Sequence, residues 1–207
     1  MKDLSLHLLD IAQNSIRANA GRISAKLSVA DGKEEKKRLL MEIADDGCGM
    51  SKELLKEALS PFTTTRSTRK IGLGLPLLEQ SALMSGGSVT VESEPSKGTR
   101  VSADFLVSSM DRVPLGDISG ACALLVRHRP EIHWHFEFAA GEAESMLDTE
   151  EIKAVLKDVP IDDNHVLEWI QNTLSEGIES IFGGVLNEVS GRIEGYSRKG
   201  TEGYGPS

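Results

Sequence analysis

The sequence PFTTTRSTRKIGLGL, from Pro61 to Leu75, is a basic segment inside an acidic chain. It has five Ser or Thr residues and no carboxylate, although the whole chain has a formal net charge of −9. Its cations and glycines are Arg66, Arg69, Lys70, Gly72 and Gly74. A helix is expected to begin at the second of these glycines, and the N–H groups of a helix N-terminus attract anions. The segment therefore predicts an anion-binding loop, although an ordinary solvated connection can have the same composition.

A polar stripe on the first predicted helix, residues 4–20, is a second feature. His7, Asp10, Asn14 and Arg17 are spaced i, i+3, i+7 and i+10, which stacks them on one face. On a surface helix such a stripe is most often the solvated face. The functional alternative places these side chains beside one ligand, because an asparagine oxygen suits Mg²⁺ and an arginine clamps phosphate.

A third feature is the sequence Asp45-Asp46-Gly47-Cys48-Gly49-Met50, which follows a predicted strand. Two glycines directly after a strand let the backbone approach a flat ligand, and a carboxylate at the strand end can face that ligand. A plain turn explains the same residues. Cys48 is interpreted as a small packing residue rather than a redox switch.

The order of predicted elements indicates an α+β fold. A helix, two strands, a short helix, the basic loop, a helix and two more strands are expected at 4–20, 22–30, 37–44, 52–59, 74–85, 88–93 and 99–107. This order predicts a two-layer sandwich, in which helices cover one face of a mixed, largely antiparallel sheet.

With these motifs in order, residues 1–107 resemble the ATP-binding domain of the GHKL superfamily (Bergerat fold), which includes gyrase, MutL and the histidine kinases. The motif sequences most resemble those of the catalytic domain of sensor histidine kinases. The motifs that carry the resemblance are residues 9–17 (LDIAQNSIR), 45–50 (DDGCGM), 61–66 (PFTTTR), 72–75 (GLGL) and 98–99 (GT).

The resemblance implies that the protein binds ATP with Mg²⁺. Asn14 would hold the metal and Arg17 would neutralise phosphate charge. Asp45 would accept the adenine amino group, with Thr99 beside it. The remaining implied contacts are Gly47 and Gly49 along the base and a lid over the triphosphate made by Arg66, Lys70, Gly72 and Gly74.

Two residues depart from the family pattern. Asp10 occupies the position where gyrase-like and MutL-like ATPases carry a glutamate base and histidine kinases usually carry asparagine. Asp10 is therefore a candidate catalytic base, or it forms a local hydrogen bond within the helix. Lys70 stands where the family often has glycine, which implies a more charged lid.

The expected activity is ATP-dependent phosphotransfer to a residue on a separate partner protein in signalling or regulation. A histidine kinase needs a phosphoacceptor helix pair, and only Met1 to Asp3 precede the first predicted helix. The protein would then resemble a histidine kinase or an anti-sigma serine kinase. Two alternatives stay open: an ATP-responsive binding module with little turnover, and a slow ATPase that uses Asp10 as its base.

Composition limits the remaining possibilities. The sequence has no apolar run of membrane-spanning length and no signal-peptide pattern, so a cytoplasmic protein without membrane contact is expected. The acidic balance and the 4% aromatic content argue against nucleic-acid binding. Two distant cysteines predict no disulfide framework.

The second half of the chain resembles no family that the motifs identify. Residues 108–116 are expected as a linker, 117–190 as a smaller C-terminal α/β domain of unknown role, and 191–207 as a flexible Gly-rich tail. Helices are expected at 117–127, 148–157 and 162–182 and a strand at 132–138. On that strand His133, His135 and Glu137 share one face. They are more often surface residues than metal ligands.

Overall fold

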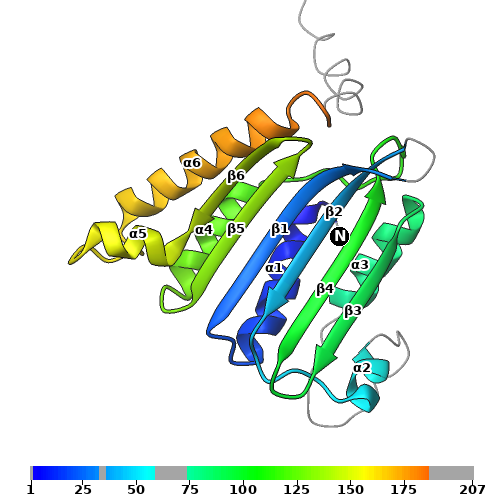
Figure 1. Cartoon of the computed structure of the whole chain (residues 1–207), viewed down its shortest axis with the longest axis horizontal. Coiled ribbons are helices and arrows are strands. Elements are labelled where there is room, and N and C mark those ends of the chain that lie inside the picture. The colour runs from blue at the N-terminus through cyan, green and yellow to red at the C-terminus, as the bar shows by residue number, and fades with distance from the viewer. Residues whose placement is uncertain (1, 33–35, 59–73, 187–207) are drawn as a thin grey trace, which may run out of the picture.

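The computed structural model describes residues 2–32, 36–58 and 74–186, and these form a six-stranded sheet with a layer of helices. The helices are α1 (Leu4–Arg17), α2 (Lys52–Ala58), α3 (Gly74–Met84), α4 (Ile118–His128), α5 (Thr149–Leu156) and α6 (Asn164–Phe182). The strands are β1 (Arg22–Asp31), β2 (Lys37–Asp45), β3 (Ser88–Glu94), β4 (Gly98–Leu106), β5 (His133–Ala140) and β6 (Ala143–Asp148). Figure 1 shows α1, α3 and α4 together behind the sheet.

The strand order is β3-β4-β2-β1-β5-β6, and every neighbouring pair is antiparallel except β1 and β5. Side chains alternate along the strands, as the period of two requires. In β1, Ile23, Ala25, Leu27 and Val29 are buried against the helices. The predicted α+β sandwich with a mixed, largely antiparallel sheet is therefore confirmed.

The face of the sheet opposite the helices is polar. Cross-strand ion pairs link Lys26 to Glu137, Arg100 to Glu42 and Arg38 to Asp104. Because these pairs join β1 to β5 and β2 to β4, they support the strand order while leaving this face hydrated. Glu137, one of the three polar residues predicted on β5, is therefore held by Lys26.

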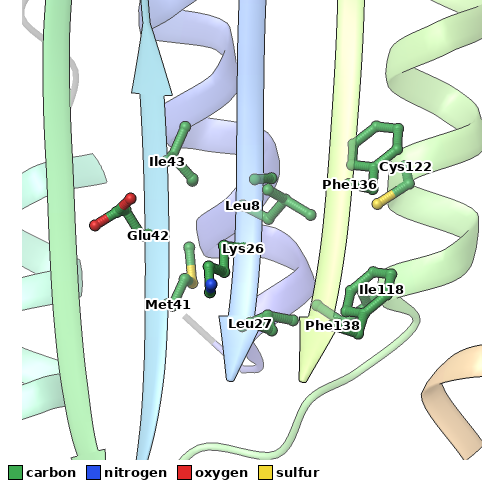
Figure 2. A pocket seen from close by; sticks show the side chains of 11 residues that line it. Leu8, Lys26, Leu27, Met41, Glu42, Ile43, Ile118, Cys122, Phe136 and Phe138 are labelled. Carbon is green, nitrogen blue, oxygen red and sulfur yellow. The ribbon is translucent and has the colours of Figure 1, made fainter. Parts of the chain in front are cut away.

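The core continues from the first half of the chain into the second. Figure 2 shows Phe136 of β5 beside Cys122 of α4 and Phe138 beside Ile118, with Leu8 of α1 nearby. These side chains surround a residual cavity of only about 10 Å³, so the packing here is close to complete. Burial raises the pKa of the Cys122 thiol, which keeps it protonated.

Residues 117–186 share this sheet with the first half of the chain. The strand β5 pairs with β1 along its whole length, and α4 packs on α1. The helix α6 covers β5 and β6 and packs on α4. The segment expected as a separate C-terminal domain thus extends the sheet and the helix layer of residues 1–107.

The expected linker, residues 108–116, is tied to the start of α1. The N–H groups of Leu4 and Ser5 donate to the carbonyls of Pro114 and Leu115, both at 2.9 Å. These are first-turn donors that lack a partner within the helix. Asp3, the N-cap residue of α1, accepts from the Leu6 N–H, also in this turn. The chain after β4 therefore helps to fix the helix that carries the polar stripe.

Most predicted element bounds agree with the structure to within a few residues. The strand β6 was not predicted, because its sequence AESMLD has only two large apolar residues and no regular alternation. The tail 191–207 lies outside the described residues. Among the described helices, none combines the length and the apolar character needed to cross a bilayer.

Candidate functional site

A cleft of about 580 Å³ opens between α1, α2, the start of α3 and the ends of β2 and β4. Its volume lies within the range of sites for drug-sized ligands. The predicted residues Asn14, Arg17, Asp45, Gly49 and Thr99 line it. The other lining residues are Ile11, Ser15, Ala18, Asn19, Cys48, Met50, Leu54, Ala58, Leu75 and Val101.

Asp45 is the most firmly held polar side chain in the cleft. Its Oδ2 accepts from the Ser15 hydroxyl at 2.6 Å. Its Oδ1 accepts from the N–H of Gly47 at 2.9 Å and from the N–H of Thr99 at 3.3 Å. Three donors from α1, from the loop after β2 and from β4 thus fix the orientation of one carboxylate. A carboxylate fixed in this way is ready to accept a hydrogen bond from a ligand amino group.

The neighbouring Asp46 has a structural task. Its Oδ1 accepts from the N–H groups of Gly21 and Arg22, at 2.7 and 2.9 Å, which ties the end of β2 to the start of β1. Asp46 is absent from the cleft lining. The two adjacent aspartates therefore differ in role, and only Asp45 faces the cleft.

Gly47 and Gly49 are required by close backbone packing. A Cβ on Gly47 would lie 2.8 Å from the carbonyl oxygen of Ala18 on one side of the cleft. Gly49 has φ +61°, and a Cβ there would lie 1.9 Å from the carbonyl oxygen of Glu94. The second glycine therefore lets the loop pack against the β3–β4 turn, a reason that exists before any ligand binds.

Thr99 belongs to a small hydrogen-bonded group at the edge of the cleft. Its hydroxyl lies 2.9 Å from the Ser93 hydroxyl, which also contacts the Gly98 carbonyl at 3.0 Å. The N–H of Met50 donates to the same Ser93 oxygen at 2.8 Å. Ser93 thus joins the glycine loop to β4 and positions Thr99 next to Asp45.

Asn14 and Arg17 lie on the face of α1 that borders the cleft. Nη1 of Arg17 contacts Oδ1 of Asn14 at 3.4 Å, a long and weak hydrogen bond. Arg17 is exposed, and both side chains line the cleft. The amide oxygen of Asn14 can therefore exchange this contact for a metal ion, and the Arg17 guanidinium can exchange it for a phosphate, at little cost.

Asp10 faces the first residue of α3. An ideal Cβ on Gly74 would lie 3.2 Å from the Asp10 Cβ and 3.4 Å from its Oδ2. Gly74 therefore allows the Asp10 carboxylate to approach the N-terminus of α3, where backbone N–H groups lack helical partners. Of the four predicted lid residues, only Gly74 can be placed, since Arg66, Lys70 and Gly72 lie outside the described residues.

His7, the fourth member of the polar stripe, is fully buried rather than solvated. Its Nε2 lies 3.1 Å from the Ser81 hydroxyl of α3, and that hydroxyl donates to the Leu77 carbonyl at 3.0 Å. The proton is therefore on Nε2, which leaves Nδ1 without a partner among the described residues. Burial lowers the pKa of His7, which favours the neutral ring. The side chain thus links α1 to α3.

The histidines predicted as alternative metal ligands meet a carboxylate instead. Nε2 of His133 lies 2.8 Å from both oxygens of Asp148, and Nδ1 of His135 lies 3.2 Å from Oδ2. In the described part of the chain, no group of three His, Cys, Asp or Glu residues has a geometry that would hold a metal.

Ser15 is the site residue that the sequence interpretation missed. It follows Asn14 directly, and its burial on α1 is typical of a small core residue. Its contact with Asp45 spans thirty positions in the sequence and depends on how α1 crosses the end of β2. Its position directly after the candidate ligand Asn14 was the sequence feature that could have indicated a role in the site.

The sheet, the helix layer and this cleft are those of the GHKL class of ATP-binding folds. Residues 2–109 match the family model described as histidine kinase-, DNA gyrase B-, and HSP90-like ATPase. This match spans more than half of the chain, and the chain belongs to this family.

Curated relatives are bacterial sensor kinases. The chain is 32% identical over 104 residues to Sporulation kinase D of Bacillus subtilis (strain 168), covering 49% of this chain and 19% of the relative. It is 33% identical over 95 residues to the sensor histidine kinase CitA of Klebsiella pneumoniae, covering 45% and 17%. The chain thus spans about a fifth of the length of the curated relatives that it matches.

A solved structure of the catalytic domain of the histidine kinase ThkA is also similar. It has a TM-score of 0.36 against this chain and 22% sequence identity, and the similarity covers 49% of this chain and 63% of that one.

The residues present fit a magnesium nucleotide. The cleft has room for an adenosine, and its apolar lining (Ile11, Met50, Leu75 and Val101 among others) suits a flat base. The group that would orient such a base is the Asp45 carboxylate, which the Ser15 hydroxyl holds. Mg²⁺ usually takes one or two protein ligands and completes its shell with water and phosphate, so a single Asn14 is sufficient.

Proposed function

We propose that this protein binds Mg-ATP in the cleft and transfers the terminal phosphoryl group to a residue on a separate partner protein. The observation that carries the proposal is the fixed Asp45 carboxylate in the same cleft as Asn14 and Arg17. Membership of the ATPase family and the similarity to named sensor kinases support it.

Each residue has a distinct task in this proposal. Asp45 accepts a hydrogen bond from the adenine amino group, and Thr99 lies beside it. Guanine carries an oxygen at that position, so ATP should bind at least ~10-fold more tightly than GTP, because a hydrogen bond to a charged group contributes about 1.5–3 kcal/mol. Gly47 and Gly49 shape the loop along the base.

The phosphates would lie toward Asn14, Arg17 and the start of α3. The amide oxygen of Asn14 would hold Mg²⁺, which when bound neutralises charge that develops on the phosphates. Arg17 adds a guanidinium at the open side, and Gly74 begins a helix whose N–H groups attract anions. We extend the proposal to Arg66, Lys70 and Gly72 as a lid over the triphosphate.

A second candidate function is slow ATP hydrolysis. The observation that favours it is the Asp10 carboxylate at the N-terminus of α3, where an attacking water could be oriented. An ATP-responsive module with little turnover is the third possibility, and it would use the same binding residues.

Incubation with ATP labelled at the terminal phosphate distinguishes these functions. Label on a protein that co-purifies with the chain supports phosphotransfer, and free labelled phosphate supports hydrolysis. Unchanged ATP, with binding shown independently, supports the sensing module. Asn14→Ala and Asp10→Asn serve as controls, since the first should remove all turnover and the second only hydrolysis.

A further inference from the structure

The far end of the sheet carries an apolar groove that the nucleotide cleft does not use. Residues of β6, α5 and α6 enclose about 630 Å³. Figure 1 shows these elements at the left edge of the molecule, whereas α2 and α3 lie at the right. The lining residues are Met146, Leu147, Asp148, Glu151, Ile152, Val155, Leu156, His165, Val166, Trp169 and Thr173.

Large apolar side chains in this groove are unusually exposed. Trp169 is 52% exposed, Met146 58% and Val155 80%. A cluster of exposed large apolar side chains is typical of an interaction site, and tryptophan is a common anchor residue of protein interfaces.

Apolar side chains form most of the groove lining, and its polar residues are Asp148, Glu151, His165 and Thr173. Its Asp148 carboxylate is already occupied, because it accepts from the Glu150 N–H at 2.9 Å and contacts both His133 and His135. Small-molecule sites need several convergent polar groups. A surface walled by two helices and lined mostly by apolar residues fits the apolar face of another helix better.

Charge identifies the occupant further. Residues 141–186 contain 11 of the chain's 32 acidic residues and 2 of its 23 basic residues. This segment therefore carries a formal net charge of −9, which equals that of the whole chain. A second copy of the chain would bring two acidic surfaces together. Residues 187–207 contain three acidic and three basic residues and so offer no charge complement.

We infer that this groove docks an amphipathic helix of another protein, with Lys or Arg residues flanking its apolar stripe. The apolar stripe covers Trp169, Val155 and Met146, and the basic flanks face the acidic residues of α5 and α6. Opposite charges accelerate association and select the partner, while the buried apolar area supplies affinity. The inference does not depend on the proposed phosphotransfer, because the groove and the cleft lie on different elements.

The test uses the full chain and a synthetic 18-residue peptide of Leu and Lys at helical spacing. Two comparison peptides have Leu and Glu at the same spacing, and Leu and Lys in strict alternation, which favours a strand. The chain has two tryptophans, and Trp134 is 1% exposed, so Trp169 reports on the groove. Trp169→Phe should remove the fluorescence change and leave the Trp134 signal.

The helical Leu–Lys peptide should shift Trp169 emission to the blue and shield it from acrylamide. Val155→Ser should weaken peptide binding at least ~5-fold, because it removes buried apolar surface. The matched control Leu83→Ser, at a residue 60% exposed on α3, should leave binding unchanged. The Leu–Glu peptide should bind more weakly than the Leu–Lys peptide.

Four results would overturn the inference. Equal binding of the alternating peptide would indicate strand addition to β6. Equal effects of Val155→Ser and Leu83→Ser would indicate general attraction to an acidic surface. If Trp169 is already shielded from acrylamide without peptide, the groove is covered by another part of the chain or by a second copy. Sedimentation would detect the second copy. Absence of binding by the helical Leu–Lys peptide at millimolar concentration would exclude the docking role.

Discussion

Replacing Asp45 with asparagine tests the base-recognition part of the site. The ionised carboxylate has two acceptor oxygens and no donor. These oxygens accept hydrogen bonds from Ser15, Gly47 and Thr99, and they can also accept one from a ligand. In Asp45→Asn the remaining oxygen is needed by the two backbone N–H groups. The Ser15 hydroxyl can reverse and accept from the new amide, so the fold should be preserved.

The adenine amino group then loses a charged acceptor and meets a donor. Loss of a hydrogen bond to a charged group costs about 1.5–3 kcal/mol, which corresponds to a Kd for ATP raised roughly 10- to 150-fold. Because an amide can donate to the guanine oxygen, the preference for ATP over GTP should fall as well.

Displacement of a fluorescent ATP analogue measures both effects. Asp46→Asn is the matched control, since the Asp46 oxygen accepts from the Gly21 and Arg22 N–H groups and the residue is absent from the cleft lining. Thermal unfolding of both variants monitors folding. An Asp45→Asn variant that binds ATP within twofold of the wild type would refute the assignment of Asp45 to the base.

Three further outcomes are expected. Asn14→Ala should remove the gain in ATP affinity that Mg²⁺ provides, measured by calorimetry with Mg²⁺ and with EDTA; an unchanged gain would take Asn14 out of the metal site. Asp10→Asn should lower phosphate release at least ~100-fold and leave ATP affinity unchanged if Asp10 is the base; wild-type release would exclude that role. Burial opposes ionisation of Asp148, but hydrogen bonds from His133, the Glu150 N–H and His135 outweigh it and lower its pKa from 3.8 to about 2. The stability that this ionised carboxylate contributes is therefore present above pH 3.8 and lost as the pH falls through about 2. In urea unfolding from pH 5 to 2, the difference between wild type and Asp148→Asn, up to about 2 kcal/mol, should shrink toward zero, and a constant difference would contradict the assigned contacts.

The fold was predictable because its signals are local. Alternation in β1 and the cap at Asp3 each depend on a few neighbouring residues. The parallel pairing of β1 with β5 was not predicted, because it joins residues more than a hundred positions apart. Side chains of both strands meet those of α1 and α4 in one core, a contact that the local sequence does not indicate.

The site shows the same division. Asn14, Asp45 and Thr99, which come from three separate motifs, line one cleft. The helical spacing of His7 gave no indication that α3 would bury it, since burial depends on a contact 74 positions away. Likewise, Asp45 and Asp46 are adjacent in sequence, and only the fold shows which of them faces the cleft.

Calorimetric titration of the full chain with ATP and Mg²⁺ tests the central claim most directly. The account predicts one saturable site per chain and at least ~10-fold weaker binding of GTP. Absence of binding heat at millimolar ATP, confirmed by an unchanged melting temperature, would contradict it.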